Sequence, residues 1–269
     1  MRFPMLAIVI FFCFAVFFSG VFIFSLSGSA DFFASALNAE RGRVLGVAEA
    51  AGETQFTAPV IVKKTGLPAS HDYTPVRRDG SEDFSFASGR AALIDDKTGA
   101  ILFSRDEDKV APIASITKLM TALVFLDYNP GWDLSYRIKP GDEEEGSRVY
   151  LYPGDTVRLK DLFYLSLVGS DNMATMLLVR AAGLDIADFV AKMNEKAAYL
   201  GLARTKFVDP VGLSAGNVST AREIAKLGRS ALKIDDIAAA TLTKSYTFST
   251  AAGAKKSINT TDALLATFP

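Results

Sequence analysis

The chain has 269 residues, with 29 Lys or Arg and 30 Asp or Glu, so its formal net charge at pH 7 is -1. Proteins that bind nucleic acid present a strongly basic face, and this balanced charge gives no support for such a role. The chain contains one His and one Cys. Because zinc sites usually use several His or Cys ligands and an intramolecular disulfide needs two Cys, we expect no His/Cys metal site, no cofactor held by one and no disulfide framework.

An apolar segment, Met5–Leu26, is the first predicted element. After Arg2, this segment contains no charged residue. As a helix its roughly 22 residues would be about 33 Å long, which is enough to span a membrane, and Arg2 favours a cytoplasmic N-terminus. We therefore predict a transmembrane anchor within residues 1–30. A cleaved signal segment, cut near the small residues 27–30, is the alternative. Either way, the remaining chain is expected to lie outside the cytoplasm, in the cell envelope.

Residues 31–87 are predicted to be a linker. They mix Gly, Ala, Ser and Pro with charged residues and show no sustained helical or strand period. The single histidine, His71, lies here. A Ser-His-Asp triad would have to use this residue, and we expect it to be a solvated linker residue instead.

Residues 88–269 are predicted to be one domain. Ala91–Ile94 and Ala100–Ser104 read as the strands of a β-hairpin joined by a turn at Asp95–Gly99. Apolar periodicity predicts a series of helices and one later strand: Ala114–Tyr128, Leu159–Ser166, Asn172–Ala182, Ile186–Gly201, Thr220–Leu232 and the strand Tyr246–Phe248. Strands on both sides of a block of helices favour an α+β fold, with a helical cluster packed on an antiparallel β-sheet.

A Ser-x-x-Lys motif opens the first predicted helix. Ser115 and Lys118 have the i, i+3 spacing that places two side chains on one helix face, about 5–6 Å apart at Cβ. A serine hydroxyl needs a neighbouring base, and a lysine can serve once burial lowers its pKa. The motif alone is weak evidence and favours an ordinary first helical turn, with a capping Ser and a solvated Lys.

A Ser-Asp-Asn triplet lies at the break between two later helices. Ser170 would relay a proton between Lys118 and a leaving group, and Asn172 would bind a substrate amide and hold Lys118 in place. Ser, Asp and Asn are also the favoured helix-capping residues, so the triplet carries its chemical meaning only together with the first motif.

Together these segments resemble the low-molecular-mass penicillin-binding proteins, the serine D-alanyl-D-alanine carboxypeptidases and endopeptidases. Pro112–Ala122 is similar to their active-site helix and Leu165–Asn172 to their second motif. Further similar blocks follow in the expected order, so the resemblance covers about residues 88–269: the hairpin Leu93–Phe103, Thr205–Leu213, Ser219–Arg222 and Ile258–Thr261.

The resemblance implies a β-lactamase/transpeptidase-like fold and a hydrolase of cell-wall biogenesis that acts on peptidoglycan stem peptides. Ser115 would attack the D-Ala-D-Ala amide with Lys118 as base, and Ser170 would help protonate the leaving amine. Water would then release the acyl-enzyme. The backbone N–H of Ser115 would supply half of the oxyanion hole, and β-lactams would acylate the same serine as inhibitors.

The family also uses a Lys-Thr-Gly motif on a strand beside the active site. The sequence contains two such triplets, Lys64–Gly66 and Lys97–Gly99, and both precede Ser115. We assign neither to the site. The resemblance places the third motif after Asn259–Thr261, so we expect the sequence given to be incomplete at its C-terminus. A missing oxyanion donor typically lowers the rate by about 10²–10³, so we expect the given chain to have reduced activity.

Two alternative functions remain open. A class A β-lactamase shares the first two motifs but deacylates with a Glu, and the corresponding stretch Ala203–Ser219 contains Asp209 and no Glu. A non-catalytic cell-wall-binding or scaffolding protein is the other alternative. Carboxypeptidase and endopeptidase activities share these motifs, so the sequence does not choose between them.

Overall fold

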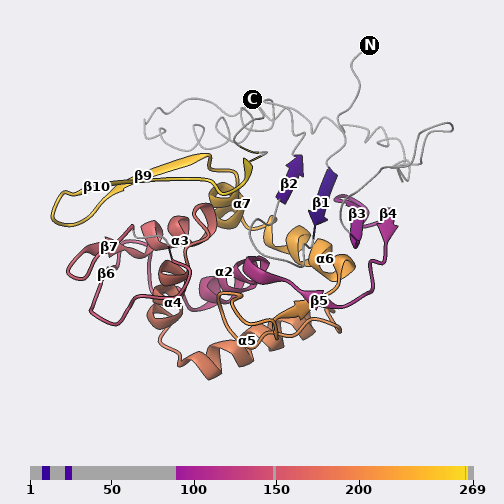
Figure 1. The fold of residues 1–269 in the computed structure, drawn as a ribbon, viewed down its shortest axis with the longest axis horizontal. Helices are drawn as coiled ribbons and strands as arrows, with labels where there is room; N and C mark the ends of the chain where they lie inside the picture. Colours follow the sequence, from indigo (N-terminus) through magenta and orange to yellow (C-terminus); the bar gives the residue numbers. More distant parts are fainter. Residues whose placement is uncertain (1–7, 13–21, 26–88, 148–149, 264, 266–269) are drawn as a thin grey trace, which may run out of the picture.

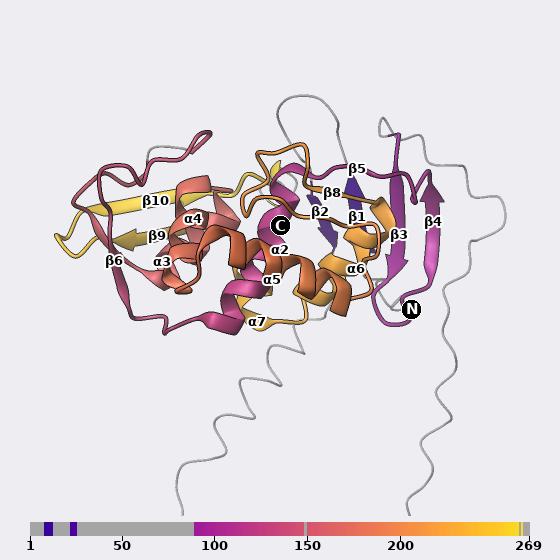
Figure 2. The ribbon, with the colours of Figure 1, turned by 90° about the horizontal axis from the view of Figure 1, so that it is seen from below.

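The computed structural model describes residues 8–12, 22–25, 89–147, 150–263 and 265. Within these residues, a cluster of helices lies between an antiparallel sheet and a separate β-hairpin, which occupy opposite ends of the molecule (Figure 1). The second view shows the same arrangement, with helix α5 lying across α2 (Figure 2). The predicted helical cluster on an antiparallel sheet is therefore confirmed.

The predicted hairpin is formed by strands β3 (Ala91–Asp95) and β4 (Ile101–Arg105). The Asp95 side chain stabilises the turn by accepting hydrogen bonds from the Thr98 backbone N–H at 2.7 Å and its hydroxyl at 2.6 Å. Asp and Thr side chains commonly stabilise turns in this way. The triplet Lys97–Gly99 therefore belongs to a turn, as expected.

The described parts of the apolar N-terminal segment are strands. β1 (Ile8–Phe12) pairs with β2 (Phe22–Ser25) and with β3, which gives the sheet the order β2-β1-β3-β4. The pairing supplies hydrogen-bond partners to an edge of β3 that would otherwise be open. The helix predicted for Met5–Leu26 is thus not shown, and no helix in the described part of the chain is long and apolar enough to cross a membrane. The linker 31–87, with His71, lies outside the described residues.

Helix α2 (Thr117–Tyr128) is the centre of the helical cluster. It contacts α3 (Leu159–Val168), α4 (Asn172–Ala181), α5 (Ile186–Tyr199) and α6 (Ala221–Ala231). Every α2 residue from 117 to 125 is buried. A helix that is buried on all sides is the expected result for a segment that is apolar all round, and it gives the first turn of α2 a fixed position in the core.

Helix α6 joins this cluster to the sheet. It packs against β1 and β3 on one side and α2 on the other. The Thr220 side chain caps its N-terminus by accepting a hydrogen bond from the Glu223 backbone N–H at 3.2 Å, which satisfies one of the free N–H groups of the first turn. The short helix α7 (Asp235–Thr241) follows and packs on α3.

A second hairpin, β9 (Ser245–Ser249) and β10 (Lys255–Asn259), lies against α3. The Tyr246 hydroxyl donates to the fully buried Asp161 carboxylate at 2.7 Å. The Tyr246 ring stacks on Tyr164 with centroids 4.2 Å apart. This docking brings the chain after β10 to the C-terminal end of α3, where the Thr261 N–H donates to the Val168 carbonyl at 3.1 Å.

Two short strand pairs complete the fold and were not predicted. β5 (Ala111–Pro112) pairs with β8 (Val218–Ser219), and β6 (Ser135–Arg137) pairs with β7 (Thr156–Arg158). The β5–β8 pair matters for the site, because it ties the chain just before Ser115 to a segment more than a hundred residues later in the sequence.

Candidate active site

The first motif lies at the entrance to α2. Ser115 is in a 3-10 turn, η1 (Ala114–Ile116), that runs into the helix, and Lys118 is in the first helical turn. The Lys118 Nζ lies 3.1 Å from the Ser115 Oγ. Ser115 is exposed and Lys118 is only 3% exposed. Ala114 has a φ of +46°, a strained conformation for a non-glycine residue, and such strain is often found at functional sites.

Burial makes Lys118 a plausible base. It lowers the pKa of the Lys118 ammonium from 10.5 to about 8, while the carboxylates of Asp171 and Asp209 act in the opposite direction. Removing an ammonium from water disfavours its charged form. A substantial fraction of Lys118 is therefore neutral near pH 8, and a neutral amine in hydrogen-bonding range of a hydroxyl can take its proton.

A backbone carbonyl also holds the lysine. Lys118 Nζ donates to the Val211 carbonyl oxygen at 2.8 Å. The loop that carries Val211 reaches the start of α2 so closely that a Cβ on Gly212 would lie 2.0 Å from the Ala114 carbonyl oxygen. Gly212 also has a φ of +90°. Only glycine adopts this backbone and permits this approach without strain.

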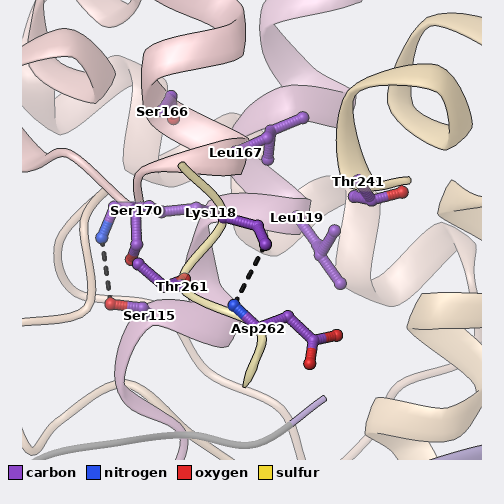
Figure 3. A pocket seen from close by; sticks show the side chains of 10 residues that line it. Ser115, Lys118, Leu119, Ser166, Leu167, Ser170, Thr241, Thr261 and Asp262 are labelled. Carbon is purple, nitrogen blue, oxygen red and sulfur yellow. Dashed lines mark hydrogen bonds between the residues drawn. The ribbon is translucent and has the colours of Figure 1, made fainter. Parts of the chain in front are cut away.

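The second motif faces the first. Ser170 has a φ of +54° and lies in the break between α3 and α4, with its side chain beside Lys118 and Ser115 (Figure 3). Asp171 caps α4, accepting from the Ala174 N–H at 2.8 Å. The Asn172 amide group donates to the Glu145 carbonyl oxygen at 2.7 Å. Asn172 therefore contacts the loop that precedes residue 148. The backbone carbonyl that holds Lys118 is that of Val211.

These groups line a pocket between α2, α3 and the segment that follows β10 (Figure 3). The α2 and η1 side contributes the serine and the lysine, and the opposite side contributes small hydroxyl-bearing residues and one carboxylate. The lining residues are Ser115, Lys118, Leu119, Ser166, Leu167, Ser170, Thr241, Thr260, Thr261 and Asp262. Among the described residues, no group of three or more His, Cys, Asp or Glu is placed to hold a metal ion.

The sequence matches one known protein family over most of its length. The family described as D-alanyl-D-alanine carboxypeptidase matches residues 77–267. The chain belongs to this family. Members of the D-alanyl-D-alanine carboxypeptidase family with solved structures share its fold: one from Mycobacterium tuberculosis has a TM-score of 0.65 and 29% identity, over 72% of this chain and 75% of that one.

Individual relatives agree with the family assignment. The D-alanyl-D-alanine endopeptidase of Pseudomonas aeruginosa is 42% identical over 143 residues, covering 52% of this chain and 46% of the relative. The corresponding protein of Escherichia coli is 39% identical with the same coverage. The DD-transpeptidase of Streptomyces K15 has a TM-score of 0.64 and 26% identity, over 70% of this chain and 79% of that one. The chain spans about half the length of the curated relatives it matches.

The structure brings three of the four sequence-predicted site residues into one pocket and places Asn172 beside it. It also shows contributors that the sequence reasoning missed. The Val211 carbonyl is a partner of Lys118, and Asp262 lines the pocket. The missed backbone partner left no signal of its own, because any residue has a carbonyl. The sequence signal for this loop was Asp209, which precedes Pro210 and Gly212 in a block that resembles the carboxypeptidase family.

Proposed function

We propose that the chain is the catalytic part of a serine D-Ala-D-Ala peptidase that acts on peptidoglycan stem peptides through an acyl-enzyme on Ser115. The observation that carries the proposal is the pair of Ser115 and Lys118, with Oγ and Nζ 3.1 Å apart and the lysine buried. The two groups satisfy the geometric requirement for a nucleophile and its base. The membership of the family supplies the substrate class.

In the proposed reaction, neutral Lys118 takes the Ser115 proton as Oγ attacks the carbonyl of the D-Ala-D-Ala amide. The backbone N–H of Ser115 donates to the developing oxyanion. Ser170 donates its proton to the leaving amine and is reprotonated by the Lys118 ammonium, while the amide bond breaks to give an ester on Ser115. Water then attacks the ester as Lys118, neutral again, accepts a proton from it, and the lysine returns this proton to the Ser115 Oγ when the ester bond breaks. Asn172, two residues after Ser170 in the second motif, is assigned to binding a substrate amide.

We favour the endopeptidase over the carboxypeptidase activity. Three relatives named D-alanyl-D-alanine endopeptidase are 42%, 38% and 39% identical to this chain. Relatives named carboxypeptidase are 28% to 32% identical. The amide cleaved would then lie in a cross-link between two stem peptides. Comparing hydrolysis of a cross-linked dimer with that of a pentapeptide ending in D-Ala-D-Ala decides between the two.

We also propose that residues 5–26 anchor the protein in a membrane, with the domain in the cell envelope. The support is the length of the uncharged run and the charge of Arg2. Insertion would separate the segment from β3, with which β1 pairs. The anchor is tested by fractionating cells that express the protein with or without residues 1–30. Recovery of both proteins in the soluble fraction would contradict the anchor.

A β-lactamase is disfavoured by the environment of Asp209. Both carboxylate oxygens accept backbone N–H groups, from Val211 at 2.8 Å and from Ser214 at 2.9 Å. A carboxylate occupied in this way is poorly placed to activate the water that deacylates a penicilloyl-enzyme. Slow release of bound penicillin is therefore expected, and rapid turnover would favour the β-lactamase.

Labelling with a fluorescent penicillin tests the proposed function. The natural full-length protein and its Ser115→Ala variant are incubated with the probe, and the labelled peptide is identified by mass spectrometry. Ser104→Ala, which removes an exposed hydroxyl on β4, is the control. We expect labelling of the parent and of Ser104→Ala at Ser115, and none of Ser115→Ala. A folded parent that does not label would favour the non-catalytic cell-wall-binding alternative.

A further inference from the structure

The loop 209–217, which contacts the first turn of α2, makes a set of hydrogen bonds that the proposed mechanism does not use. We infer that Asp209 and Asn217 are positioning residues, which hold the Val211 carbonyl against the Lys118 amine and thereby aim that amine at Ser115. The inference rests on the proposed function for its catalytic meaning. Its geometric content, the placement of Lys118 by the loop 209–217, can be tested separately.

Asp209 organises the backbone around Val211. Its Oδ1 accepts from the N–H groups of Val211 at 2.8 Å and Gly212 at 2.5 Å, and its Oδ2 accepts from Ser214 at 2.9 Å. Three N–H groups converging on one carboxylate fix the loop as a tight turn. Hydrogen bonds to a charged acceptor are stronger than those between neutral groups. The Val211 carbonyl therefore has little freedom to turn away from Lys118.

Asn217 joins this turn to the catalytic helix. Its Oδ1 accepts from the N–H groups of Val208 at 2.7 Å and Asp209 at 3.1 Å, and its Nδ2 donates to the Asp209 carbonyl at 2.8 Å. The other Nδ2 hydrogen goes to the Thr117 hydroxyl at 3.0 Å. Two acceptor and two donor positions are the full capacity of an asparagine amide, and this one is completely buried. The loop is thus tied to the residue that precedes Lys118.

The second anchor of the loop is Thr121, one helical turn further along α2. Its hydroxyl donates to the Pro210 carbonyl at 2.5 Å. Successive carbonyls of the loop, those of Pro210 and Val211, therefore meet Thr121 and Lys118 on the same helix. These two hydrogen bonds fix the position of the Val211 carbonyl along α2.

The arrangement has a specific consequence for proton transfer. A neutral amine has two N–H donors and one lone pair. When the Val211 carbonyl takes one N–H at 2.8 Å, rotation about the last bond of the Lys118 side chain is restricted. Such a restriction leaves two tetrahedral directions for the second N–H and the lone pair, and one of them points to the Ser115 hydroxyl 3.1 Å away. Orientation of a catalytic group in this way contributes to rate because misplacement by about 1 Å can cost about 10²-fold.

The charge of Asp209 acts on the same amine. Among the described residues, the carboxylates that act on Lys118 are those of Asp171 at the start of α4 and Asp209 in the loop, and Asp262 lines the same pocket with its carboxylate directed away from the lysine (Figure 3). The carboxylates of Asp171 and Asp209 both raise the pKa of Lys118 against the effect of burial. Replacing Asp209 by Asn removes one of these charges and places an N–H donor against the loop.

Titration of Lys118 in matched variants tests the inference. Asp209→Asn is compared with Glu223→Gln, because Glu223 also accepts backbone and hydroxyl hydrogens near this loop, from Arg204 and Thr205. The extent of Lys118 acetylation by acetic anhydride is measured against pH by mass spectrometry, and thermal melts show that each variant is folded. Acylation by a fluorescent penicillin is followed over the same pH range.

In Asp209→Asn we expect the pKa of Lys118 to fall below about 8. Acylation of this variant should slow at least about tenfold, even at a pH where Lys118 is neutral. Glu223→Gln should change neither the pKa nor the acylation rate. If Asp209→Asn does not fold, Asn217→Asp replaces it. The added charge should then raise the pKa of Lys118, while the lost link to Thr117 slows acylation.

An unchanged Lys118 titration in the folded variant, or an equal change in Glu223→Gln, would overturn the inference. The inference would also be overturned if Asp209→Asn were acylated at the parental rate at a pH where Lys118 is neutral, because the loop would then have no effect on the orientation of the amine. Failure of the parent to label with penicillin at any pH would refute the proposed function instead, and the acetylation titration would still decide whether the loop positions Lys118.

Discussion

The two walls of the pocket are held in different ways. The base wall consists of η1 and the first turn of α2, to which the loop 209–217 is hydrogen-bonded. It is fixed by hydrogen bonds between segments about a hundred residues apart, including Lys118 to Val211 and Asn217 to Thr117. The hairpin wall, residues 260–262, follows β10 and depends on the docking of one hairpin on α3.

This difference matches what each wall would do. In the proposed mechanism the base wall holds the groups whose atoms react, and a base must keep its orientation through both acylation and deacylation. The hairpin wall would face the substrate. It is held by the stacking of the Tyr246 ring, by the hydrogen bond from the Tyr246 hydroxyl and by the backbone hydrogen bond from Thr261. We therefore expect changes in the base wall to affect chemistry or folding strongly, and changes in the hairpin wall to have milder effects.

Removal of the base should have the largest effect on rate. In Lys118→Ala we expect acylation by a fluorescent penicillin to slow about 10³-fold, within the range typical for loss of a general base. Lys192→Ala is the control, since Lys192 makes an exposed ion pair with Glu195, and such pairs contribute little. Acylation of Lys118→Ala at a near-parental rate would contradict the assignment of Lys118 as the base.

Two glycine substitutions compare close packing with backbone strain alone. Gly212 and Gly253 have φ values of +90° and +83°, but a Cβ on Gly212 meets the Ala114 carbonyl and one on Gly253 meets nothing within 4 Å. We expect Gly253→Ala to lower the free energy of unfolding by about 1 kcal/mol, and Gly212→Ala by at least about 3 kcal/mol. Urea unfolding measures both, and equal losses would show that the loop does not depend on this approach.

The hairpin wall is tested by Tyr246→Phe. The change removes the hydroxyl that donates to Asp161 but keeps the ring that stacks on Tyr164. We expect a loss of about 1–2 kcal/mol in stability and acylation slowed only a few-fold, with the titration of Lys118 unchanged. Tyr199→Phe, at a tyrosine that is 86% exposed, is the control. A shift in the Lys118 titration would show that the two walls are coupled.

The helices could be predicted from sequence because their signals are local. The predicted helix Asn172–Ala182 and the observed α4, Asn172–Ala181, begin at the same residue, since Asp171 is a favourable cap that precedes an apolar run. The N-terminal segment shows the opposite case. An apolar run of this kind does not by periodicity alone distinguish a buried strand from a helix. Its described parts are the strands β1 and β2, and β1 pairs with β3.

The site could be predicted only in part. Ser115 and Lys118 were identifiable because their chemistry depends on residue type and on a spacing of three. The contact of Lys118 with Val211 joins residues 93 positions apart through a backbone carbonyl, and neither the residue type nor the spacing signals it. The two-residue strands β5 and β8, which help to bring that loop to the helix, are too short for any periodic pattern.

The most direct test of the account is the pH dependence of Ser115 acylation by a fluorescent penicillin, with the labelled site checked by mass spectrometry. Because only the neutral amine accepts a proton, the rate constant should rise about tenfold per pH unit below the pKa of Lys118. It should then level off near pH 8. A rate that keeps rising towards 10.5, the ordinary value for lysine, or one that does not depend on pH, would contradict the claim that buried Lys118 is the base for Ser115.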